Sequence, residues 1–111
     1  MKDFMLIFIS GDYSVLSPED MQANMNDWFT WIGDLKAKGI YVAGEALNPG
    51  GKTVKGKDPV VTDGPFAESK EVVGGYFIIK AETIEEAAEI SKTSPDLPLG
   101  GAVEVREVMK F

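Results

Sequence analysis

The 111-residue chain contains no histidine and no cysteine, so few of its side chains are able to do chemistry at neutral pH. These absences exclude thiolate nucleophiles, disulfides and Cys-based zinc sites. They also remove the commonest general base and the commonest ligand for transition metals. Among the remaining groups we take Asp63, in the segment Asp-Gly-Pro-Phe at 63–66, as the candidate catalytic acid or base.

Two interpretations of this segment remain open. As a turn, the aspartate bonds to its own backbone, the glycine accepts a positive φ and the proline fixes the exit. As a site, the same turn directs the Asp63 carboxylate and the Phe66 ring into a cleft beside the first helix. The two roles are compatible.

Three further candidate substrate-binding residues lie on that helix. Asn24 is either a polar residue at the edge of an apolar stripe or a hydrogen-bonding group that points into the site. Trp28 and Trp31 follow along the same side, where they form either an apolar wall of the site or part of the core.

Two charged residues complete the candidate set. Glu45, at a strand end, faces either the cleft or solvent, and Lys70 is either part of a solvated loop or the cation for an anionic substrate. A carboxylate site for Mg²⁺ or Ca²⁺ at Asp63, Glu45 and Glu68 lacks any recognised spacing. We therefore predict no metal site and no cofactor.

Composition narrows the partners and the location. The 18 acidic and 11 basic residues give a net charge of -7, which repels phosphate backbones and anionic membranes. The apolar run at 4–9 is too short for a signal sequence or a membrane span. We expect a cytoplasmic protein, with one domain over residues 1–111, that binds neither nucleic acid nor membrane.

The candidate residues must be positioned by a small set of helices and strands. Ser17 and Pro18 form a helix start, and Met21, Met25, Trp28, Ile32 and Leu35 predict the packed stripe of a helix that ends near Gly39. A capping box from Thr83 to Glu86 opens a second helix that stops before Pro95. The predicted strands are 4–9, 40–47, 72–79 and 102–109, with a hairpin of arms 52–55 and 59–62.

This order predicts an α+β fold, the ferredoxin-like βαββαβ arrangement with an inserted β-hairpin. Right-handed crossovers place both helices on one face of the antiparallel sheet. Strands 4–9 and 76–79 are apolar on both sides, so the other face would be exposed and apolar. We therefore predict a homodimer packed through that sheet face.

The chain also resembles a known family. The segment Thr-Asp-Gly-Pro-Phe-Ala-Glu-Ser-Lys-Glu at 62–71, followed by Gly-Gly-Tyr at 74–76, is similar to the signature of the DGPF branch of YCII-related proteins. Ser-Pro-Glu at 17–19, Gly-Glu at 44–45 and the segment 100–106 also match. The resemblance implies a ferredoxin-like fold assembled as a dimeric α/β barrel.

The resemblance carries functional implications as well. Related members include enzymes that act on small ring compounds, such as a chloromuconolactone dehalogenase, and a His-Asp pair has been proposed as their reactive centre. DGPF-type members are often encoded beside extracytoplasmic-function sigma factors, which implies a functional link. Where many relatives carry the helix histidine, this chain has Asn24, whose amide does not exchange a proton near pH 7.

Two hypotheses follow. In the first, the homodimer is a small-molecule-binding or regulatory module whose cleft is lined by Asn24, Trp28, Trp31, Asp63 and Phe66. In the second, it is a lyase or isomerase acting on a lactone-like oxygenated ring, in which Asp63 is the acid or base while Asn24 and Lys70 orient the substrate. The missing histidine favours the first.

Overall fold

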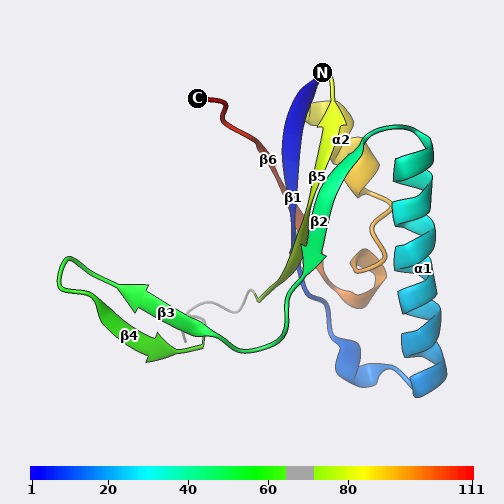
Figure 1. Ribbon diagram of the computed structural model, residues 1–111. Helices are drawn as coiled ribbons and strands as arrows, with labels where there is room; N and C mark the ends of the chain where they lie inside the picture. Colours follow the sequence, from blue (N-terminus) through cyan, green and yellow to red (C-terminus); the bar gives the residue numbers. More distant parts are fainter. Residues whose placement is uncertain (65–71) are drawn as a thin grey trace.

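The computed structural model describes residues 1–64 and 72–111. The strands, helices and short 3-10 helices follow in the order β1 (Lys2–Ile9), η1 (Tyr13–Val15), α1 (Pro18–Ala37), β2 (Tyr41–Ala46), β3 (Lys52–Lys55), β4 (Val60–Asp63), β5 (Val73–Ala81), α2 (Ile84–Ser91), η2 (Leu97–Leu99) and β6 (Ala102–Glu107) (Figure 1). Each predicted helix and strand is present, and η1 and η2 are additional. Among the described residues, no helix is long and apolar enough to cross a membrane.

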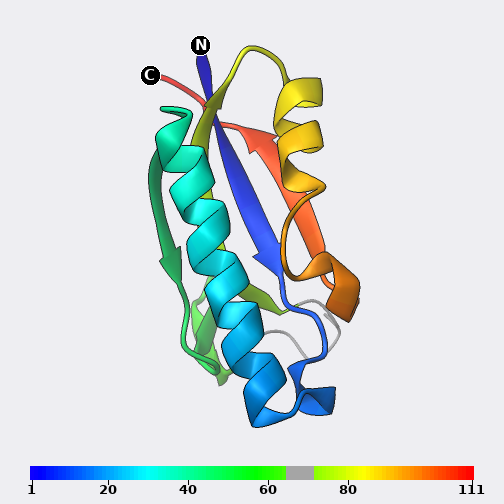
Figure 2. The ribbon, with the colours of Figure 1, turned by 90° about the vertical axis from the view of Figure 1, so that its right-hand side faces the viewer.

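The four long strands form one antiparallel sheet in the order β2-β5-β1-β6. Both helices lie on the same face of this sheet (Figure 2). Strand β5 lies between β1 and β2, which are connected through α1. Strand β1 lies between β5 and β6, which are connected through α2. The topology is therefore two split βαβ units. The predicted ferredoxin-like α+β fold is confirmed.

The predicted helix starts are confirmed in atomic detail. The Ser17 hydroxyl accepts a hydrogen bond from the Asp20 backbone N–H at 3.1 Å, and Pro18 occupies the first turn of α1. The Thr83 hydroxyl accepts from the Glu86 backbone N–H at 3.2 Å and caps α2 in the same way. These caps fix where each helix leaves the sheet.

The core lies between the sheet and the two helices. Alternate side chains of β1 point into it, because Phe4, Leu6 and Phe8 are buried while their neighbours are partly exposed. Strand β5 adds Phe77 and Ile79. The other side chains of β1 and β5 face away from the helices, so one face of the sheet is uncovered.

The predicted packed stripe of α1 holds only in part. Leu35 is buried, but Met21 and Met25 are 50% and 53% exposed. The reason is that a groove lies beside the first half of α1, and both methionines line it. The sequence pattern records apolar residues on one side of a helix and does not distinguish core from groove.

The predicted hairpin, β3–β4, forms a separate two-stranded sheet that projects away from the body (Figure 1). The radius of gyration of 15.6 Å accordingly exceeds the roughly 13 Å expected for a compact chain of this length. The projection begins close to the end of β2, where the Leu47 backbone N–H bonds to the Gly74 carbonyl oxygen at 2.9 Å.

Candidate functional site: a groove beside the first helix

A largely apolar groove of about 820 Å³ runs between α1, over most of its length, and the neighbouring ends of β2 and β5. Helix α1 contributes side chains from Pro18 to Ile32, and the chain beyond β2 contributes Leu47 to Pro49. Its size is in the usual range for sites that bind small molecules. A second, smaller hollow of about 520 Å³ lies on the other side of α1, between Asp27 and Pro98.

An aromatic cluster forms the inner wall of the groove. The Phe8 ring meets the rings of Trp28 and Phe77 edge-on, with centroids 5.0 Å and 4.9 Å apart. The Tyr41 ring packs against Phe77 at 5.2 Å. Trp28 lines the groove, whereas Trp31 is only 7% exposed and belongs to the core. Trp28 thus lies at the groove, and Trp31 lies in the core, where it also borders the smaller hollow.

Glycines allow β2 and β5 to approach closely beside this wall. A Cβ atom at Gly44 would lie 2.8 Å from the Tyr41 hydroxyl oxygen and would also overlap the Phe77 ring. A Cβ at Gly75 would lie 2.7 Å from the Glu45 carbonyl oxygen. The β1–β5 register also shifts between Phe8 and Ile9, opposite the glycines of β5, as is typical of a bulge.

Asp96 is an acidic residue among those that line the groove, and the sequence analysis missed it. The residue is only 3% exposed, and its Oδ1 atom has no hydrogen-bond partner in the described part of the chain. Burial raises the pKa of this carboxyl to about 6. The segment Ser-Pro-Asp-Leu-Pro at 94–98 resembles an ordinary turn, and no sequence pattern indicated that its aspartate is buried.

The position of Asp96 is fixed by its own backbone. Its carbonyl oxygen accepts hydrogen bonds from the backbone N–H groups of Leu99 and Gly101, each at 3.0 Å. Gly101 has no room for a side chain, since a Cβ there would lie 2.9 Å from the Asp96 Cβ. These contacts fix the conformation of the loop between α2 and β6 around Asp96.

Asn24 is half-buried, and its side-chain Nδ2 donates to the Pro95 carbonyl oxygen at 3.3 Å. This hydrogen bond joins α1 to the loop that carries Asp96. Asn24 and Asp96 both line the groove. Asn24 and Trp28 therefore line the same groove as an acidic residue. That residue is Asp96, whereas the sequence analysis expected Asp63.

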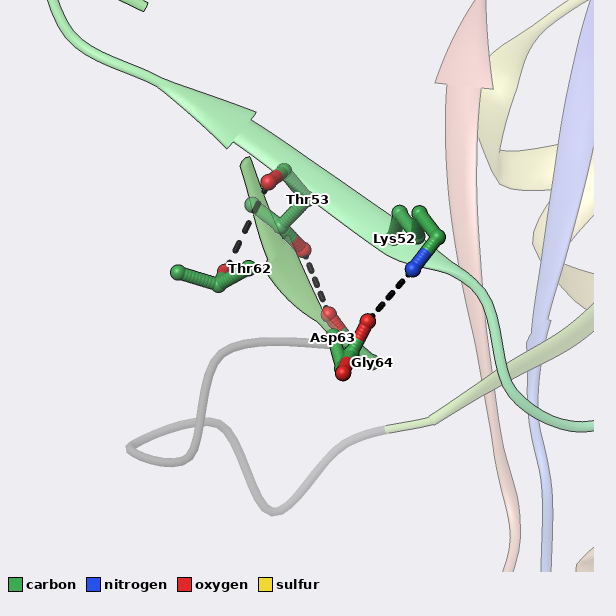
Figure 3. A network of polar contacts seen from close by, with 5 residues as sticks. All are labelled: Lys52, Thr53, Thr62, Asp63 and Gly64. Carbon is green, nitrogen blue, oxygen red and sulfur yellow. Dashed lines mark hydrogen bonds and ion pairs between the residues drawn. The ribbon is translucent and has the colours of Figure 1, made fainter. Parts of the chain in front are cut away.

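Asp63 occupies a different environment, because it is the last residue of β4 and lies at the base of the projecting hairpin (Figure 3). Its side chain is 89% exposed, and its Oδ1 accepts from the Lys52 ammonium at 2.5 Å. It is not among the residues that line the groove. Gly64 has the positive φ, 73°, that the turn interpretation expects, and its carbonyl oxygen accepts from the Thr53 hydroxyl at 2.7 Å; residues 65 and 66 of the motif lie outside the described residues.

The remaining candidates are placed as follows. Glu45 is exposed on β2 at the rim of the groove, opposite Tyr76 in the strand register. Burial raises the pKa of the Tyr41 hydroxyl, and the nearby Glu45 charge raises it further. Phe66 and Lys70 lie outside the described residues. In the described ranges, no three acidic side chains cluster in a way that would hold a metal ion.

Comparison with solved structures gives a full-length but loose similarity. The chain is similar to 5-chloro-2-hydroxyhydroquinone dehydrochlorinase (TftG) from Burkholderia phenoliruptrix AC1100, solved with 2,5-dihydroxybenzoquinone. The identity is 18%, the match covers 97% of this chain and 95% of the other, and the TM-score is 0.44.

Comparison with curated protein sequences gives no significant match. The family model of the YCII-related domain, in contrast, matches residues 3–111. That match includes both helices, all but the first residue of the sheet, and every residue that lines the groove. The chain therefore belongs to the YCII-related domain family.

Proposed function

We propose that this protein binds a small, mainly apolar molecule in the groove beside α1. The observation that carries the proposal is Asp96, a groove-lining residue whose buried carboxyl has an oxygen without a hydrogen-bond partner in the described part of the chain. A buried, unpaired carboxylate is costly, and a ligand that donates a hydrogen bond to it removes part of that cost. The expected ligand therefore combines a flat or compact apolar body with a hydroxyl or N–H group.

The other residues of the groove support this ligand class. Trp28 offers an aromatic surface, and Met21 and Met25 offer flexible thioether side chains that adapt to the shape of a ligand. Both methionines are about half exposed without a ligand. A bound apolar molecule would cover surface that otherwise contacts water, which favours binding.

We further propose that the protein works as a homodimer through the uncovered face of the sheet. Met5 lies opposite Ile78, and Ile7 lies opposite Tyr76, on the face away from the helices. These residues form an apolar strip on β1 and β5 that Arg106 and Glu104 border on β6, and an exposed apolar strip with a charged border is typical of an interface. This arrangement is the one that the dimeric α/β barrel requires.

A thermal-shift screen with lactones, phenols and small carboxylic acids tests ligand binding. A stabilising compound should lose its effect in Met25→Lys, because that substitution places an ammonium group at the groove. Ala23→Lys is the matched control, since residue 23 is exposed on the same helix and is not part of the groove lining. Equal loss of stabilisation in both variants would argue against the groove as the site.

The second candidate function is that of a lyase or isomerase on a small oxygenated ring, with Asp96 as the acid or base. The favouring observation is its raised pKa of about 6, because general acid–base catalysis is most effective near the pKa of the catalytic group. Asp63, 89% exposed and paired with Lys52, lacks this environment within one chain. Turnover of a screened compound that is lost in Asp96→Asn and kept in Asp63→Asn would support this candidate.

Three expectations from the sequence stay predictions beside these proposals. They are the assignment to the DGPF branch, the functional link to an extracytoplasmic-function sigma factor, and the cytoplasmic location. Of these, the link to a sigma factor bears most on the regulatory version of the function. It predicts that the ligand alters the output of the associated sigma factor.

A further inference from the structure

The β3–β4 hairpin, which we call the arm (residues 52–63), exposes apolar side chains. Val54, Val60 and Val61 are 63%, 61% and 58% exposed. Within the described residues, β3 and β4 pair only with each other. An isolated two-stranded hairpin is marginally stable in water, so this arm requires a further surface to hold it.

The direction of the arm indicates where that surface lies. The arm leaves the end of β2 and extends to the side of the sheet opposite the helices (Figure 1). This is the side toward which Ile7 and Tyr76 point. A second copy packed on the uncovered sheet face would therefore lie beside the arm.

The charge of the arm fits the same partner. The arm contains three lysines and two aspartates, so it contributes +1 to the net charge of -7, and the rest of the chain contributes -8. A basic arm on an otherwise acidic protein is attracted by an acidic surface. A second copy of this chain presents such a surface.

One side of the arm has the character of an interface. Val54 and Val61 are directly opposite each other in the β3–β4 register, so they form one continuous apolar patch. Lys52 and Asp63, which are paired at 2.5 Å, lie on the same side at the edge of this patch. An apolar centre with a charged border is typical of protein interfaces.

We propose that the arm packs its Val54 and Val61 side onto the second copy and thereby holds the two subunits together. This proposal rests on the homodimer proposed above and adds the part of the interface that the sheet face does not provide. In this proposal, the arm that raises the radius of gyration of the chain above that of a compact domain contacts the second copy. Each subunit contributes one arm, so the contact is formed twice by the two-fold symmetry of a dimer.

The chain has no cysteine, so a single introduced thiol reports on this contact without interference. We would compare Val61→Cys with Val60→Cys, which is adjacent, equally exposed in one chain and on the other side of the arm. In the dimer, the thiol at position 61 should react with a disulfide reagent about tenfold more slowly than the one at position 60. That ratio corresponds to about 1.4 kcal/mol of protection.

A second background separates this proposal from the dimer itself. Ile7→Arg places a charge in the centre of the uncovered sheet face and should give monomers in which both thiols react equally fast. If light scattering shows a dimer and the thiol at position 61 still reacts as fast as that at position 60, the arm proposal alone is wrong. If the unmodified protein is a monomer at all accessible concentrations, the dimer and arm proposals are both wrong, while ligand binding in the groove is unaffected.

Discussion

The side-chain amide of Asn24 donates a hydrogen bond to the carbonyl oxygen of Pro95 at 3.3 Å, which connects the first half of α1 to the loop between α2 and β6. The next residue in that loop is Asp96, whose carboxyl is buried in the groove lining. One hydrogen bond therefore brings a helix residue and a carboxylate from opposite halves of the chain to the same groove.

The first prediction concerns Asn24→His, which places an imidazole close to the Asp96 carboxylate. The negative charge should raise the pKa of the histidine above its usual value of roughly 6.5. The folded pKa then exceeds the unfolded one, so the added stability is complete below the unfolded pKa and is lost as the pH rises through the folded pKa. NMR titration of the imidazole measures this directly, because the chain has no other histidine.

Two carboxylate variants are the controls for this titration. Asp96→Asn should lower the pKa of the introduced histidine, whereas Asp63→Asn should leave it unchanged, because Asp63 is on the projecting arm. The opposite pattern would indicate that Asp63 reaches the groove, and it would restore the pairing proposed from the sequence.

The second prediction concerns the cost of burying Asp96. Its folded pKa of about 6 is above the unfolded value of 3.8, so ionisation destabilises the folded protein. The cost is fully present above pH 6 and disappears as the pH falls toward 3.8. Asp96→Asn should therefore raise the free energy of unfolding by as much as about 3 kcal/mol at pH 8 and by little at pH 4. Urea denaturation at several pH values measures the difference.

Asp12→Asn provides a comparison with the opposite sign. Hydrogen bonds from the Ser14 hydroxyl and backbone N–H lower the pKa of Asp12, so its ionised form stabilises the fold. That stabilisation is present above the unfolded pKa and is lost as the pH falls through the folded pKa.

A destabilised Asp96→Asn at pH 8 would mean that the carboxylate has a partner in solution, and the ligand class proposed here would then be wrong.

The third prediction separates core from groove on α1. Leu35 is 2% exposed, so Leu35→Ala should cost about 2–5 kcal/mol of stability. Met25→Ala should cost less than about 1 kcal/mol, because Met25 is half exposed and faces the groove. Equal losses in chemical denaturation would show that Met25 is packed in solution and that the groove is closed there.

The fourth prediction concerns assembly. Light scattering at micromolar concentration should give the mass of a dimer, and Ile7→Arg should give a folded monomer, because a charge at the centre of an apolar interface is costly. Ala23→Arg is the comparison on α1, where the residue is exposed and lies on the other side of the sheet. It should change the dimer much less than Ile7→Arg.

Much of the fold was predictable because its causes are local. The cap at Ser17, the capping box at Thr83 and the apolar alternation of β1 each depend on residues close in sequence. The exposure of Met21 and Met25 was not predictable, because it depends on where the sheet ends relative to α1. Periodicity identifies which side of a helix is apolar and contains no information on what covers it.

The candidate site was predicted less completely, again for a physical reason. Asn24 and Trp28 were found from their helical spacing, and both line the groove. Asp96 was missed because its burial results from the packing of a loop against α1, a contact between residues that are 71 positions apart, counted from Asn24 to Pro95. Asp63 attracted attention through its turn motif, yet the structure gives its carboxylate a lysine partner and solvent.

The central claim is that small molecules bind in the groove beside α1 and contact Asp96. The most direct measurement is an NMR titration of ¹⁵N-labelled protein with the phenols and lactones that stabilise it in the thermal-shift screen. The side-chain amide of Asn24, the indole N–H of Trp28 and the backbone N–H of Asp96 should shift together, and Asp96→Asn should weaken the binding. Shifts confined to the hairpin at 52–63 or to the hollow at Lys92 and Pro98, with these three signals unmoved, would contradict the account.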